Sequence, residues 1–207
     1  MKIVLFFYKS FRGTFSVMNL CYNDGGGSET LKKLPMRDYP EELKKDKYGL
    51  LGTVEENACG VIAVHNILLP YETPPFAEMI KFFSRHMAAF FGRMGTRLFP
   101  LLRYLKKYGK TERVKKGKAY DAVLGVIVYL NRFFIPVGLH YFAGRAEEMG
   151  KYRFYNMCRG SEDLLLSPKE AREKLKTVRY VKKYRAVSPL FFGFTDDQTK
   201  FAKENEE

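Results

Sequence analysis

The sequence predicts an α+β fold in which a buried helix comes first and an antiparallel sheet follows. Three observations lead to this prediction. Residues 59–69 are apolar nearly all round and stop at Pro70, which is typical of a buried helix. Residues 75–91 and 96–108 then repeat apolar side chains with a helical period. After residue 118 the chain changes to short β-branched and aromatic runs between turn residues, which indicates strands.

The first 47 residues precede this pattern. Residues 1–22 alternate loosely between apolar and polar, which favours two short strands or a hairpin. Residues 23–28 are rich in glycine and are expected to form a turn or flexible loop. Residues 29–47 are polar and include Pro35 and Pro40, so we expect a mostly irregular arm.

The second half is expected to form the sheet and one more helix. Residues 122–129, 137–145 and 151–157 are predicted to be successive antiparallel strands. Ser167, Pro168 and Glu170 form the signature of a capping box, so a helix should begin there and run to about Thr177. Residues 178–187 and 190–194 are expected to be closing strands.

A chain of 207 residues with 46% apolar residues is expected to form one soluble globular domain. We therefore divide it into N-terminal strands and an arm at 1–48, a main domain at 49–195, and an acidic tail at 196–207. Cys21, Cys59 and Cys158 form no close pair, and no convincing signal peptide or membrane span is present. A cytoplasmic location is the expectation.

Cys59 is the candidate nucleophile. It lies in the first turn of the predicted helix, where free N–H groups and the helix dipole should lower the pKa of its thiol. His140, in the middle of a predicted strand, can act as its base, and Asn156, at the end of the next strand, can orient the imidazole. His65 is expected to be a core or interface histidine and His86 to be exposed on its helix, and neither has a metal-binding partner at helical spacing.

These residues carry a resemblance to a known family. The segment from Asn57 to Leu68, which reads NACGVIAVHNIL, resembles the nucleophile helix of papain-like cysteine peptidases. The similarity is to the bacterial branch related to the double-glycine, bacteriocin-leader peptidases. The segments GLHYF at 138–142 and YRFYN at 152–156 are similar to that branch's His strand and Asp or Asn strand, in the same order. The resemblance covers about 49–175.

The resemblance implies a papain-like fold, with the nucleophile helix packed on a twisted antiparallel sheet. It also implies a cysteine peptidase that uses Cys59, His140 and Asn156 as a catalytic triad, without a cofactor or metal. The family places a Gln before the cysteine as an oxyanion donor, whereas this chain has Thr53 and Glu56 in that region. Asn57 or Thr53 is the expected substitute donor.

Two other functions remain open. One is a catalytically inactive papain-like module, in which Cys59 is a small buried apolar residue. The other follows from the net charge of +13 and the basic clusters at 93–118 and 169–185, which could bind nucleic acid or an anionic lipid surface. For a peptidase, the same charge favours an acidic peptide or protein substrate. The sequence does not determine the oligomeric state.

Overall fold

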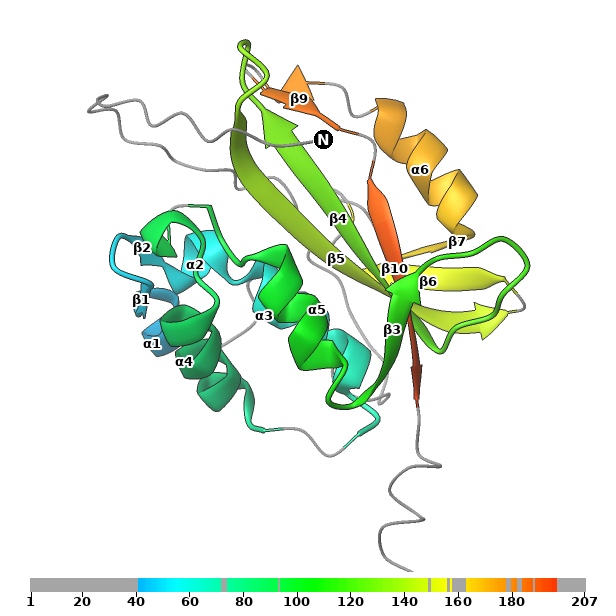
Figure 1. Cartoon of the computed structure of the whole chain (residues 1–207), viewed down its shortest axis with the longest axis horizontal. Coiled ribbons are helices and arrows are strands. Elements are labelled where there is room, and N and C mark those ends of the chain that lie inside the picture. The colour runs from blue at the N-terminus through cyan, green and yellow to red at the C-terminus, as the bar shows by residue number, and fades with distance from the viewer. Residues whose placement is uncertain are drawn as a thin grey trace, which may run out of the picture.

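The computed structural model describes residues 41–71, 74–92, 94–148, 150–155, 157, 163–177, 180–181, 184–187 and 189–196. The predictions for residues 1–40 and for the acidic tail after Asp196 lie outside these residues. The described part is an α+β structure, as the sequence predicted, with one antiparallel sheet between two helical layers (Figure 1).

The helices before the sheet lie on one of its faces (Figure 1). They are α1 Glu41–Lys44, α2 Val54–Asn57, α3 Cys59–Leu68, α4 Phe76–His86 and α5 Leu98–Leu105, with a 3-10 turn, η1, at Phe90–Gly92. Helix α3 matches the predicted buried helix, and all of its residues except His65 are buried. The second predicted helix ends at His86, before η1, and the third spans only the middle of its predicted range.

The main sheet is antiparallel throughout and has the strand order β3-β10-β4-β5-β6-β7. Its strands are β3 Gly109–Arg113, β10 Leu190–Asp196, β4 Ala122–Leu130, β5 Pro136–Glu148, β6 Lys151–Tyr155 and β7 Leu164–Leu166. Two short strands, β8 Tyr180–Val181 and β9 Tyr184–Ala186, form a hairpin that pairs with the end of β4. The sequence predicted a single strand there and did not predict β3 or β7.

Alternation along the strands divides the core into two parts. Tyr141 of β5 faces α3, α4 and α5, whereas Phe142 faces the opposite side of the sheet. On that side helix α6, Pro168–Thr177, covers the sheet with Ala171 and Leu175. Both sides of the sheet are therefore buried by helices.

The predicted capping box of α6 is confirmed. Glu170 N–H donates to Ser167 Oγ over 3.2 Å, and Ser167 N–H donates to a carboxylate oxygen of Glu170 over 2.7 Å. These reciprocal bonds satisfy backbone donors that the first helical turn leaves free.

The predicted boundary between an arm at 1–48 and a domain starting at 49 falls within a hairpin of the structure. Strand β1, Lys47–Tyr48, pairs with β2, Gly52–Thr53, so the boundary would cut through a hairpin. The Tyr48 side chain is fully buried in the core beneath the first helical layer. Within the described residues, the folded unit therefore includes 41–48, because its core needs that tyrosine.

Candidate active site

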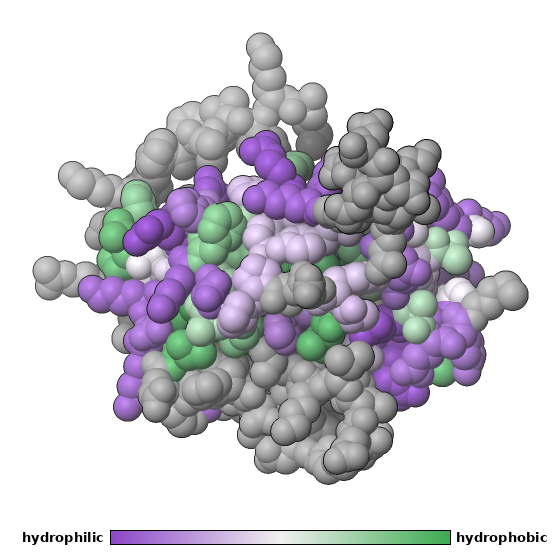
Figure 2. Space-filling model, turned by 90° about the horizontal axis from the view of Figure 1, so that it is seen from below, coloured by the Kyte–Doolittle hydropathy of each residue, from purple (hydrophilic) through white to green (hydrophobic). Residues whose placement is uncertain are grey.

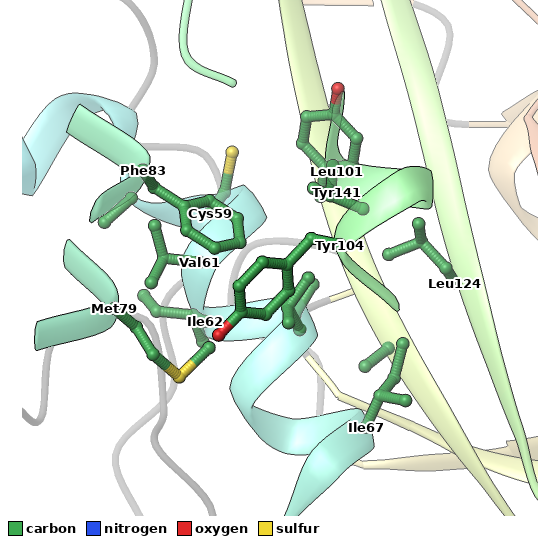
Figure 3. Close-up of a cluster of buried hydrophobic side chains, with 14 of the residues drawn as sticks. Cys59, Val61, Ile62, Ile67, Met79, Phe83, Leu101, Tyr104, Leu124 and Tyr141 are labelled. Atoms are coloured by element: carbon green, nitrogen blue, oxygen red, sulfur yellow. The ribbon is translucent and has the colours of Figure 1, made fainter. Parts of the chain in front are cut away.

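Cys59 is the first residue of α3, and only Ala58 separates it from α2. The helix begins there because Ala58 leaves the helical conformation, with ψ near 0°. Figure 3 shows Cys59 at this end of α3, beside the apolar core and close to β5, which carries Tyr141. The prediction that Cys59 lies in the first turn of a buried helix is therefore correct.

The sulfur of Cys59 lies at an edge of strand β5. Its Sγ donates a hydrogen bond to the carbonyl of Leu139 over 3.7 Å, and the backbone N–H of Tyr141 also faces it. Among the described residues, β6 pairs with β5 only from Ala143 onward. The backbone of β5 before Ala143 is therefore not paired with β6, and Cys59 at the start of α3 contacts it there. The sulfur thus contacts the backbone on both sides of His140.

The pKa of the Cys59 thiol differs from the sequence expectation. Burial raises the pKa to about 11, although the N–H groups of Tyr141, Gly60 and Cys59 lower it in part. The sequence led us to expect that the helix N-terminus lowers the thiol pKa. That expectation is wrong, because the net shift of the pKa is upward. The physical reason is that the side chain is almost inaccessible, and losing water penalises the thiolate more than these donors stabilise it.

His140 lies on the opposite face of β5 from its neighbours Leu139 and Tyr141. Its ring stacks with that of Phe142, with centroids 6.3 Å apart, and its partner across the sheet is Ile127. Phe142 and Ile127 belong to the core beneath α6, whereas Cys59 belongs to the core beneath the other helices. The structure brings the backbone beside His140 to the sulfur, and strand alternation directs the imidazole to the other face.

Asn156, the predicted orienting residue, lies outside the described residues. The preceding residue, Tyr155, is the last of β6 and pairs with Ala143 of β5. The strand that leads to Asn156 is thus next to the strand that carries His140, as the sequence order predicted.

The two candidate oxyanion donors are engaged elsewhere. The amide of Asn57 donates to the carbonyl of Thr53 over 3.0 Å, and the hydroxyl of Thr53 donates to Glu56 over 3.2 Å. Asn57 is buried, whereas Thr53 is only partly buried. Asn57 lies near the strand edge that Cys59 contacts, because its side-chain oxygen and the Leu139 carbonyl both lie within about 4 Å of where a Cβ on Gly95 would stand.

A buried polar cluster beside Cys59 was missed by sequence reasoning. The hydroxyl of Tyr48 bonds to Thr96 Oγ1 over 2.5 Å, and the hydroxyl of Tyr141 donates to the carbonyl of Thr96 over 2.7 Å. Burial raises the pKa of both tyrosines, and a negative charge at Cys59 would raise it further, which indicates that they lie near the sulfur. No sequence signal identifies the cluster, because its members come from three segments that are far apart in the chain.

The two other histidines, His65 and His86, lie on helices α3 and α4. The His65 ring packs edge-on to Phe76, with centroids 5.3 Å apart, and His86 is exposed at the end of α4. The half-buried position of His65 and the exposed position of His86 agree with the predictions made for them. In the described part of the chain, no three His, Cys, Asp or Glu side chains are grouped so that they could hold a metal ion.

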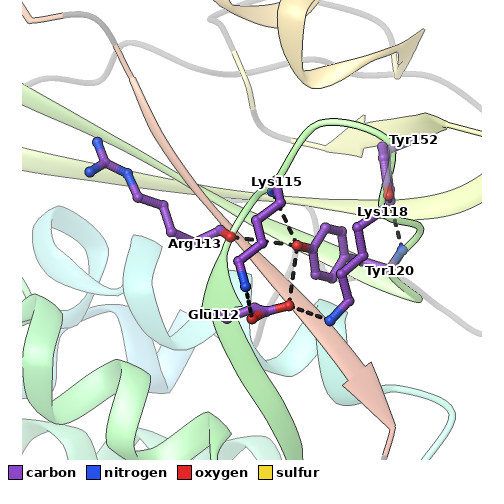
Figure 4. A network of polar contacts seen from close by, with 6 residues as sticks. All are labelled: Glu112, Arg113, Lys115, Lys118, Tyr120 and Tyr152. Atoms are coloured by element: carbon purple, nitrogen blue, oxygen red, sulfur yellow. Dashed lines mark hydrogen bonds and ion pairs between the residues drawn. The ribbon is translucent and has the colours of Figure 1, made fainter.

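Part of the basic cluster at 93–118 has a role in the fold. Lys115 and Lys118 both form ion pairs with Glu112, next to the ring of Tyr120 (Figure 4). These pairs lower the pKa of Glu112 to about 2. Lys107 lies 5.8 Å from the ring centroids of both Phe82 and Tyr104. On the face seen in Figure 2, hydrophilic residues are mixed with apolar ones and form no continuous stripe.

The comparisons with known proteins identify no family. No protein-family model matches the chain, and no curated protein matches it. Among the helices within the described ranges, none is long and apolar enough to cross a membrane.

Proposed function

We propose that this protein is a cysteine hydrolase that cleaves a peptide or amide bond, with Cys59 as nucleophile and His140 as general base. One observation carries the proposal. The Cys59 sulfur, at the start of α3, contacts the Leu139 carbonyl and the Tyr141 N–H, which are the backbone groups on either side of His140. A helix that begins with a cysteine against the edge of a histidine-bearing strand is the arrangement that the sequence resemblance implies.

The raised pKa of Cys59 determines the kind of mechanism. With a pKa of about 11, the resting enzyme holds a neutral thiol rather than a preformed thiolate and imidazolium pair. Attack therefore needs a general base during the reaction. The sulfur forms a bond to the substrate carbonyl carbon while its proton passes to the His140 imidazole.

The remaining steps follow from this proton transfer. His140 returns the proton to the leaving amine as the carbon–nitrogen bond breaks, which leaves a thioester on Cys59. Water then hydrolyses the thioester, with His140 again as base, and Asn156 orients the ring. For these steps, the imidazole must approach the sulfur across the edge of β5, from the face where it stacks on Phe142.

The developing oxyanion requires hydrogen-bond donors. The backbone N–H of Cys59, at the start of α3, is one donor in this proposal. Asn57 supplies the second when its amide leaves the Thr53 carbonyl, 3.0 Å away. Loss of one such donor costs about 10²–10³ in rate, so Asn57→Ala should retain a measurable but much lower rate.

A papain-like module without activity is the second candidate, and specific observations favour it. The Cys59 thiol is buried with a raised pKa, and the side chains of Asn57 and Thr53 are bonded to other groups. In that case Cys59 contributes to the core, and the module acts by binding.

The deciding experiment compares the wild-type chain with Cys59→Ala and His140→Ala on a broad peptide library, with fragments identified by mass spectrometry. The hydrolase proposal expects Cys59-dependent fragments, which both variants lose. His65→Ala is the matched control, because it removes a histidine from α3 that lies outside the proposed mechanism. All variants should keep the wild-type thermal transition within a few degrees, so that lost activity is not lost folding.

Identical fragments from wild type and Cys59→Ala, or none from wild type across the library, would contradict the hydrolase and favour the binding module. If activity needs Cys59 but survives in His140→Ala, the result would support Cys59 as the nucleophile and contradict His140 as the general base.

A further inference from the structure

The turn between β4 and β5 forms an exposed apolar tip that the proposed hydrolysis does not use. We call residues Arg132, Phe133, Phe134, Ile135 and Pro136 the hairpin tip. The side chains of Phe133 and Phe134 are each 65% exposed, and that of Ile135 is 55% exposed. Figure 1 shows this hairpin projecting beyond the helical layers, with β9 beside it. Three large adjacent apolar side chains in water need an explanation.

The tip holds a defined shape rather than a loose loop. Asn131 Oδ1 accepts hydrogen bonds from the N–H groups of Phe133, over 2.8 Å, and Ile135, over 3.0 Å. The carbonyl of Asn131 accepts the N–H of Phe134 over 3.0 Å, and its own N–H donates to the Ile135 carbonyl over 2.9 Å. Since Pro136 has no N–H, the apolar residues of the tip present no unsatisfied backbone donor.

The satisfied N–H donors make the tip compatible with a lipid boundary as well as with water. A backbone N–H without a partner is strongly penalised in a hydrocarbon phase, whereas in water it costs little. A loop that only faces water has no need to satisfy every donor of its apolar residues. A loop that enters the boundary between headgroups and acyl chains does.

Phe134 adds an independent indication. Its φ is +60°, in the left-handed region that favours glycine or asparagine. Burial does not explain a phenylalanine there, because the side chain is largely exposed. An aromatic ring at this strained position is explained if the ring has a binding role.

The tip also carries a positive charge. The Arg132 guanidinium lies 4.6 Å from the centroid of the Phe133 ring, so the cation is beside the apolar group. Strand β9 pairs with the end of β4, with Arg185 opposite Leu130 in the register. The sequence has no Asp or Glu in 122–146 or in 178–195. An apolar tip that carries a cation, in a stretch of the hairpin whose sequence has no acidic residue, is complementary to an anionic lipid surface.

We propose that the hairpin tip docks this protein on an anionic membrane surface, with Phe133, Phe134 and Ile135 inserted among the lipids and Arg132 at the phosphate groups. A second copy of the chain fits less well, because two tips in contact would bring both Arg132 side chains together. Nucleic acid also fits less well, since Ile135 and Pro136 cannot stack on bases and the backbone donors are already used.

The docked orientation places the candidate active site near the membrane. Leu139, whose carbonyl contacts Cys59, follows Pro136 by three residues of β5, which corresponds to about 10 Å along the strand. The docking itself does not depend on the chemistry of Cys59.

The test uses the absence of tryptophan from the chain, which makes Phe133→Trp a unique fluorescent reporter. Vesicles of phosphatidylcholine with phosphatidylserine should shift its emission to shorter wavelength, and vesicles of phosphatidylcholine alone should shift it far less. Phe99→Trp is the matched control, because Phe99 is an aromatic residue that is 79% exposed on α5, away from the hairpin tip in the sequence. Its emission should not change with either vesicle.

Sedimentation with the anionic vesicles measures the partition coefficient between water and membrane. The double variant Phe133→Ser with Phe134→Asn should lower the partition coefficient about tenfold or more, because two aromatic side chains no longer leave water. Asparagine tolerates the left-handed backbone at 134, so the hairpin and the thermal transition should be preserved. Arg132→Gln should lower the coefficient by about fivefold.

Three results would overturn the proposal. The first is unchanged emission of Phe133→Trp in anionic vesicles, and the second is an equal shift of Phe99→Trp. The third is a shift of the Phe133→Trp emission without lipid. A shift that rises with protein concentration would assign the tip to self-association, and a shift on addition of an oligonucleotide would assign it to nucleic acid binding.

Discussion

Alkylation of Cys59 by iodoacetamide at pH 7.5 should be at least about 100-fold slower in the folded chain than in the urea-unfolded chain. Burial raises the pKa of this thiol from 9.0 to about 11, and only the thiolate reacts. A difference of about two pKa units means about 100-fold less thiolate at any pH below both values. Restricted access to the buried sulfur slows the reaction further.

The assay measures the modification rate of the Cys59-containing peptide by mass spectrometry from pH 6 to pH 10.5. In the folded chain the rate should rise about tenfold for each pH unit without levelling off below pH 10. A rate that levels off below pH 8, or that exceeds the rate of the unfolded chain, would refute this reasoning. It would show that the start of α3 stabilises a thiolate, as the sequence alone had suggested.

The same pKa shift predicts a loss of stability in alkaline solution. The folded pKa is raised above the unfolded value, so the contribution is fully present below pH 9 and is lost as the pH rises towards 11. The loss from Cys59 should reach about 2–3 kcal/mol. Buried tyrosines also titrate at high pH, so the measured quantity is the difference in urea unfolding between wild type and Cys59→Ser. Parallel curves for the two proteins between pH 8 and 10.5 would contradict the prediction.

Two further predictions concern packing and capping. Gly60→Ala should lower the free energy of unfolding by about 1–3 kcal/mol, because a Cβ there would lie 2.6 Å from Thr96 Oγ1, and overpacking outweighs the better helix propensity. Urea denaturation measures this, and a stabilised variant would show that α3 and Thr96 separate easily. Ser167→Ala should cost about 1 kcal/mol by removing the capping box with Glu170, and an unchanged thermal transition would mean that the cap contributes nothing.

Local patterns in the sequence predicted the elements that they alone can specify. The apolar stretch ending at Pro70 gave α3, and the capping box at Ser167 gave the start of α6. The long β-branched runs gave β4 and β5 within a few residues. Such elements are visible in sequence because hydrophobic period and capping residues act over a few neighbouring positions.

Elements that depend on distant partners were missed. Strand β3 is polar and charged, and it exists because it pairs with β10, which comes about 80 residues later. Tyr48 lies in a polar segment, and only its contacts beneath the helices show that it belongs to the core. No local pattern reports a pairing or a contact of that kind.

For the candidate site, the sequence by itself determined which chemical groups are present and in what order: a cysteine at the start of a helix and a histidine on a strand of the sheet. The tertiary structure decided how they are placed. It brought the sulfur to the edge of β5, turned His140 towards Phe142 and buried the thiol, which reversed the expected pKa shift. The physical reason is that strand alternation, edge pairing and desolvation depend on neighbours far away in sequence.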